Sequence, residues 1–109
     1  MSDSGRITEV SWLDSMWRPA ILLPMPTVLM LLGWRFFFYS NEGNEPIHIH
    51  CQKGDAEAKY WLDAQAFEIS EAYAYGMSPG DRRTVRSIIF QHFDYIVSEW
   101  VRFQEHKND

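Results

Sequence analysis

Residues 47–62 read IHIHCQKGDAEAKYWL, and this stretch has the clearest fold signal in the chain. Gly54 and Asp55 separate two runs in which apolar and polar residues alternate. That arrangement is typical of a β-hairpin closed by a two-residue type II′ turn. Such a turn places His50 directly opposite Lys59. A register shifted by one residue would mix apolar and polar side chains on both faces, so the pattern favours the two-residue loop.

The alternation divides the hairpin side chains between two faces. The apolar face, which is expected to meet the core, consists of Ile47, Ile49, Cys51, Ala58, Tyr60 and Leu62. The polar face consists of His48, His50, Gln52, Glu57, Lys59 and Trp61. A small buried thiol is the expected role of Cys51. The polar face is where we expect a functional site.

Histidine takes and gives a proton near neutral pH, so His48 and His50 are candidate acid–base residues. Lys59, opposite His50, would lower the pKa of that imidazole, whereas Glu57 would raise it. Arg35, on the preceding aromatic strand, is a further candidate source of positive charge. An acid, a base and a cation together suit metal-independent cleavage of a phosphodiester. These five side chains are the catalytic candidates of the sequence.

Two alternatives for the histidines stay open at this point. In the first they are only polar residues of a solvated sheet face, or they bond to the loop at 40–46. In the second, His48 and His50 bind a metal, because a His-x-His pair on a strand points both imidazoles the same way. Zinc needs at least a third protein ligand, for which Glu57 is the one obvious local carboxylate. We therefore expect no metal and no other cofactor.

Around this hairpin the sequence predicts further strands. Residues 27–32 and 34–39 have the β-branched and aromatic composition of strands, and 47–52 and 56–62 form the hairpin itself. The segment 64–75 is ambiguous between a short strand and a helical turn. The chain is thus expected to be an α+β domain, with a mainly antiparallel four-stranded sheet and a long C-terminal helix packed on one face.

The C-terminal helix has both a start signal and a periodic pattern. Ser78 is a good N-cap, Pro79 suits the first helical position, and Asp81 stands where a capping-box acid belongs. One apolar face has three- and four-residue spacing and consists of Val85, Ile88, Ile89, His92, Ile96, Trp100 and Phe103. A second apolar strip is formed by Phe90, Phe93, Val97 and Val101. A partner chain or residues 1–24 are expected to cover this second strip.

Composition limits the class of protein. The 109 residues are 46% hydrophobic, which is enough for one domain with a core. A net charge of −5 counts against a dedicated nucleic-acid binder, because phosphate binding needs clustered Lys and Arg. With a single cysteine there is no internal disulfide, and a cytoplasmic protein is expected. The apolar run at 20–34 is too short for a membrane span and contains two prolines, so no membrane association is expected.

Residues 1–24 differ from the rest of the chain. They begin polar, continue with Trp12, Leu13, Met16 and Trp17 at helical spacing, and end at Pro24. We therefore expect a single domain at 25–109, preceded by an N-terminal extension at 1–24 that is not native if translation starts at Met25.

Several short motifs occur together in the order seen in a known family. They are MPTV (25–28), RFFFYSNEG (35–43), EP (45–46), HIH (48–50), EAK (57–59) and WLD (61–63). With Trp100 near the end, the chain from 25 to 103 resembles the bacterial domain of unknown function numbered 4160. It departs from the family at Ile47, where a proline is frequent, and over 64–75. The family commonly begins at the MPTV motif, which is a second reason to regard Met25 as the natural start.

The resemblance implies a small bacterial protein whose gene often lies beside that of another uncharacterised family, numbered 2442. This arrangement is similar to a toxin–antitoxin pair. The leading hypothesis is an interaction module of such a pair, which binds a second copy of itself or the product of the adjacent gene. One alternative is a metal-independent ribonuclease, with His48 and His50 as proton-transfer groups and Trp61 stacking a base. The other is a small metal-binding protein, and whether the chain is an enzyme stays open.

Overall fold

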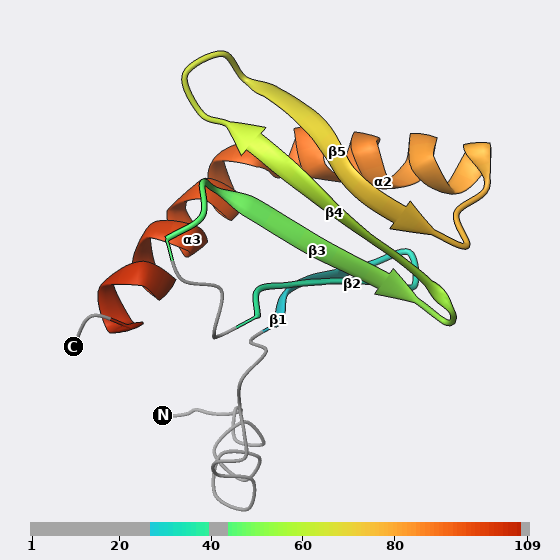
Figure 1. Cartoon of the computed structure of the whole chain (residues 1–109), viewed down its shortest axis with the longest axis horizontal. Helices are drawn as coiled ribbons and strands as arrows, with labels where there is room; N and C mark the ends of the chain where they lie inside the picture. The colour runs from blue at the N-terminus through green and yellow to red at the C-terminus, as the bar shows by residue number, and fades with distance from the viewer. Residues whose placement is uncertain (1–26, 40–43, 108–109) are drawn as a thin grey trace, which may run out of the picture.

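The computed structural model describes residues 27–39 and 44–107, so the predicted extension at 1–24 lies outside the described residues. One antiparallel sheet has its strands in sequence order. They are β1 (Thr27–Leu31), β2 (Trp34–Phe37), β3 (His48–Lys53), β4 (Ala56–Asp63) and β5 (Glu68–Tyr75). Helices α2 (Pro79–Gln91) and α3 (Phe93–Lys107) follow. In Figure 1, α2 passes behind β4 and β5, and α3 turns toward the start of β3. The predicted α+β class is confirmed.

The β3–β4 hairpin has the predicted register. Lys53 pairs with Ala56 and His50 pairs with Lys59. Of the two loop residues only Gly54 has a positive φ, 59°, as a type II′ turn requires. Of the apolar face, Ile49, Cys51, Ala58 and Tyr60 are fully buried. Burial raises the pKa of the Cys51 thiol to about 12, which keeps it protonated.

The prediction of four strands is wrong, because 64–75 contributes a turn and a fifth strand. The carboxylate of Asp63 accepts hydrogen bonds of 3.0 Å from the backbone N–H groups of Gln65 and Ala66. This Asx-type turn reverses the chain, with Phe67 at a φ of 56°. The strand that follows, β5, lies at the edge of the sheet and is mostly exposed. A register shift opposite Lys59 and Tyr60 also interrupts its pairing with β4.

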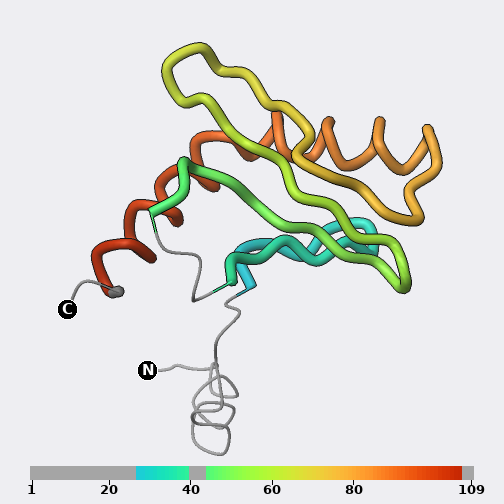
Figure 2. Tube along the Cα trace, in the orientation of Figure 1, coloured from blue at the N-terminus to red at the C-terminus, as the bar shows by residue number. Residues whose placement is uncertain are grey.

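The single long helix is also wrong, since the helical region bends at His92. The capping box at its start is present, with Ser78 and Asp81 bonded to each other's backbone N–H groups. Hydrogen bonds continue on both sides of His92, to Ile88 at 3.1 Å and from Ile96 at 2.9 Å. His92 is the C-cap of α2, with a φ of −117° and a ψ of 25°, so the regular helix ends there and the chain changes direction before α3, as the trace in Figure 2 shows. The bend lets α2 and α3 follow the twisted sheet.

Because of the bend, most of the second apolar strip is covered by the chain itself. Phe93 does not lie on a free strip: it is buried in the core, and its ring lies 4.7 Å from that of Phe67. The ring centres of Phe67 and Phe90 lie 5.4 Å apart, so the β4–β5 turn covers the end of α2 and the start of α3. Val97 packs against the core, while Val101 is exposed. Much of the strip is therefore covered by the chain itself.

The core fills the space between the sheet and the two helices. The sheet contributes Trp34, Phe36, Ile49, Tyr60 and Leu62, and Phe38 follows directly after β2. The helices contribute Val85, Ile88, Ile89, Phe93, Ile96 and Trp100. Arg82 of α2 ties the helix to β5, because its guanidinium binds Glu71 at 3.0 Å. Neither described helix is long and apolar enough to cross a membrane.

Candidate functional site

A set of polar side chains gathers on the face of β3 and β4 that points away from the core. We call Glu45, His48, His50, Lys59 and Tyr73 the histidine cluster. His48 and His50 are 0% and 2% exposed, so they are not residues of a solvated face. Because β3 and β4 pair in register and β4 pairs with β5, the three strands place His50, Lys59 and Tyr73 side by side.

His48 is held by the loop before β3. Its Nδ1 lies 2.9 Å from the carbonyl oxygen of Pro46, which can only accept. Nδ1 therefore carries the proton, and Nε2 is the acceptor of the neutral ring. The ring is packed against the indoles of Trp61 and Trp100, at centroid distances of 5.5 Å and 4.8 Å. The predicted alternative that a histidine bonds to the loop at 40–46 is thus observed for His48.

His50 lies among three aromatic side chains. Its ring stacks on Phe37 at 5.5 Å and meets the edge of Tyr39 at 4.5 Å. The hydroxyl of Tyr73 lies 3.3 Å from Nδ1 of His50, a pair in which either partner can donate, depending on the tautomer. The rings of His48 and His50 lie 5.1 Å apart. Histidine is the side chain most often used for proton transfer, so the held imidazole of His50 is a candidate for that role.

The ammonium of Lys59 forms the charged part of the cluster. It donates to Oε1 of Glu45 at 2.6 Å and lies 4.4 Å from the centre of the Trp61 ring. The same oxygen of Glu45 is 3.7 Å from Nδ1 of His48. The hydrogen bond from Lys59 lowers the pKa of Glu45, so this carboxylate is ionised at neutral pH. The Glu45 side chain is 39% exposed and forms the outer part of the cluster.

The other predicted site residues lie around the cluster. Arg35 donates to the Thr27 hydroxyl at 2.8 Å, and its guanidinium is 4.3 Å from the Phe37 ring, on which His50 stacks. It is thus one aromatic ring away from the imidazole. The half-buried Glu57 pairs across the strands with Gln52 and Tyr75, and the carboxylate that meets the histidines is Glu45 instead.

Sequence reasoning missed Glu45 and Tyr73. Tyr73 belongs to β5, in the segment that the sequence left ambiguous between a strand and a helical turn, so no register with Lys59 could be predicted for it. Glu45 belongs to a loop, where the positions of residues along the sequence do not predict which way a side chain points.

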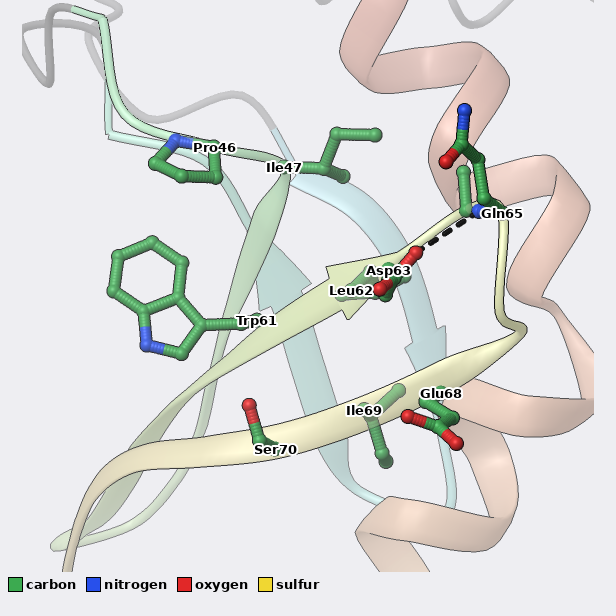
Figure 3. A pocket seen from close by; sticks show the side chains of 10 residues that line it. Pro46, Ile47, Trp61, Leu62, Asp63, Gln65, Glu68, Ile69 and Ser70 are labelled. Atoms are coloured by element: carbon green, nitrogen blue, oxygen red, sulfur yellow. Dashed lines mark hydrogen bonds between the residues drawn. The ribbon is translucent and has the colours of Figure 1, made fainter.

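A hollow of about 600 Å³ borders the cluster. It lies where β3 begins and the β4–β5 hairpin extends beyond it, and Figure 3 shows the Trp61 indole and Pro46 along one side. Ile47, Leu62 and Ile69 supply apolar surface, and polar groups come from Asp63, Gln65, Glu68 and Ser70. Trp61 and Pro46 each contact His48 as well, so the hollow and the cluster share a wall.

The site combines side chains that can exchange protons with one permanently charged cation. Two imidazoles and a phenol exchange protons, and the ammonium of Lys59 stabilises negative charge. Within 27–39 and 44–107, no three His, Cys, Asp or Glu side chains come together in a way that would hold a metal ion. What the observed arrangement offers is acid–base chemistry on an anionic group.

The fold and the cluster together define a small α+β protein with a histidine site on the outer face of its sheet. The family described as "Domain of unknown function (DUF4160)" matches residues 33–101, and the chain belongs to this family. The matched region contains the β3–β4 hairpin with both histidines, all of α2 and the first part of α3. No curated protein matches the chain, and no solved structure matches it.

Proposed function

We propose that the histidine cluster binds the phosphate of RNA and cleaves the phosphodiester without a metal. The supporting observation is the position of Glu45. Its carboxylate lies 2.6 Å from the Lys59 ammonium and 3.7 Å from the His48 ring, in a place that stabilises an anion. A phosphate oxygen that took the place of this carboxylate would meet the same groups. In this view, Glu45 occupies the site until substrate displaces it.

Displacement of Glu45 is energetically reasonable. The Glu45 side chain is 39% exposed and can turn toward solvent, whereas Lys59 is 11% exposed and would be costly to leave unpaired. A phosphodiester keeps the negative charge next to Lys59, so the ammonium stays paired after the exchange.

The proton transfers follow from the two rings. His50 takes the proton of the ribose 2′-hydroxyl while the 2′ oxygen forms a bond to phosphorus. The bond from phosphorus to the 5′ oxygen breaks, and protonated His48 gives a proton to that leaving oxygen through Nε2. The products are a 2′,3′-cyclic phosphate and a 5′-hydroxyl. Lys59 stabilises the charge on the phosphoryl oxygens, and Tyr73 positions His50.

The first test is cleavage of a mixed-sequence RNA by the purified protein in excess chelator. Lys59→Ala is expected to lower the cleavage rate about a hundredfold, because the cation next to the phosphoryl oxygens is lost. Lys53→Ala is the matched control, since Lys53 is an exposed lysine of the same hairpin, and its rate is expected to stay within about twofold of the original. No cleavage by the original chain, or equal cleavage by the Lys59 variant, would refute this function.

A role as an interaction module is a second candidate, favoured by the edge of the sheet at β1. This strand is the first in the sheet order, so its outer side faces no other described strand. Met30 of β1 is 62% exposed, and Leu32, in the turn directly after the strand, is 69% exposed with a φ of 53°, which is unfavourable for a leucine. An exposed apolar edge strand is suited to pairing with a strand of another chain. We propose the product of the adjacent gene as that partner.

Co-expression of the two chains tests this candidate. A complex that elutes as one species in size-exclusion chromatography with light scattering is expected. Met30→Lys combined with Leu32→Lys is expected to abolish it, because charges replace the apolar contacts at the edge. Val101→Lys, an exposed apolar position on α3, serves as control. Absence of a complex, or a complex insensitive to the double substitution, would contradict the proposal, and a dimer of this chain alone would point to a second copy instead.

A further inference from the structure

The geometry points to the hollow beside Trp61 as a subsite for a guanine base. This inference rests on the proposed function, because the base would belong to the nucleotide whose phosphate meets Lys59. The hollow of about 600 Å³ lies within the range of roughly 300–1,000 Å³ that small-ligand sites occupy. Its mixture of apolar walls and few polar groups is also that of a ligand site.

The indole of Trp61 provides a flat aromatic surface on which a planar base can stack. The indole borders the hollow, as Figure 3 shows, and the Lys59 ammonium lies 4.4 Å from the ring centre. Bases stack on aromatic side chains whatever their identity, so stacking provides binding without selection. Because Trp61 belongs to the hollow and also contacts Lys59 and His48, one nucleotide can place its base in the hollow and its phosphate at the cluster.

The polar lining provides the selection. Asp63 and Glu68 are carboxylates and therefore accept hydrogen bonds but do not donate them. Asp63 already binds two backbone N–H groups of the turn, whereas Glu68 is exposed at the start of β5. Guanine presents its N1–H and its 2-amino group side by side, which fits one carboxylate with two charge-assisted hydrogen bonds. Uracil has a single N–H flanked by carbonyl oxygens, and a carboxylate repels these.

Calorimetric titration of the full chain with guanosine and uridine monophosphates tests this subsite without any cleavage. Guanosine monophosphate is expected to bind at least about tenfold more tightly than uridine monophosphate. Glu68→Gln should remove this difference, while Glu105→Gln, an exposed glutamate of α3, should leave it unchanged. Trp61→Ala should weaken both nucleotides. Equal binding of both nucleotides, or no binding, overturns the inference.

Two additional measurements separate the outcomes. Amide chemical shifts of residues 61–70 are expected to move on addition of guanosine monophosphate, and movement confined to other residues would also overturn the inference. In the RNA arm, a uridine pentamer with one central guanosine should bind more tightly than the all-uridine pentamer. If only the free nucleotide shows the preference, the ligand is a guanine nucleotide and not RNA. Guanine binding without RNA cleavage would refute the proposed function alone, whereas cleavage without base preference would refute this subsite alone.

Discussion

Replacement of His50 by glutamine is expected to lower the rate of RNA cleavage by about 10²- to 10⁴-fold, the usual contribution of a positioned acid–base group. Glutamine fills a similar volume and can still hydrogen-bond to the Tyr73 hydroxyl. It does not titrate near neutral pH, so it cannot take the proton of a ribose hydroxyl. The rate should be measured under single-turnover conditions in chelator between pH 5 and 8. A rate that rises and then falls with pH in the original chain should lose one of its limbs in the variant.

Folding is the main risk with this residue, because His50 is buried and contacts Phe37 and Tyr39. The variant is therefore compared with the original chain by thermal unfolding, and His50→Ala serves as a second substitution. His106→Gln is the matched control, because this histidine lies exposed near the end of α3. A folded His50 variant that cleaves as fast as the original chain would show that the proposed mechanism is wrong.

Replacement of Trp100 by alanine is expected to reduce the free energy of unfolding by about 3–5 kcal/mol, as for other buried aromatic residues. Trp100 connects three parts of the molecule. Its indole meets Phe38 edge-on at 5.2 Å and lies 4.8 Å from the ring of His48. It also lies 6.3 Å from Phe103 on its own helix. Loss of the indole leaves a cavity where α3 meets both the core and the histidine cluster.

Chemical denaturation with urea measures this loss, with the midpoint and slope determined separately. The neighbouring Val101→Ala is the control, because Val101 is exposed and its substitution should change stability by less than about 0.5 kcal/mol. Trp100→Phe should fall between the two. A Trp100→Ala variant as stable as the control would mean that α3 is not anchored through this residue.

The part of the fold that could be predicted is the part that local chemistry determines. Gly54 and Asp55 define the turn, and the period-two alternation on both sides allows only one register. The opposition of His50 and Lys59 followed directly from that count. The start of α2 was equally accessible, because Ser78 and Asp81 form a capping box within four residues.

The remainder depends on contacts between distant segments. The edge strand β5 is mostly exposed, so its sequence does not alternate clearly between apolar and polar residues. The irregularity in its pairing with β4 further disturbs the alternation. The bend at His92 contains no proline or glycine, so it reflects the surface on which the helix packs. Glu45 reaches Lys59 because the turn into β3 aims it there. A single sequence contains no local signal for any of these three features.

The order of strands in the sheet has a consequence for how the chain reaches its native state. Every strand pairs with the one that precedes it, so each hydrogen-bonded ladder closes over a short stretch of polypeptide. Chains with such local pairing have a low relative contact order and pay little loop-closure entropy before contacts form. The β3–β4 hairpin, with its tight reversal, is a natural nucleus for this zipping. The hairpin brings His48, His50 and Lys59 together at this early step. Glu45, Tyr73 and Trp100 complete the surroundings of the two histidines only when the rest of the chain has packed.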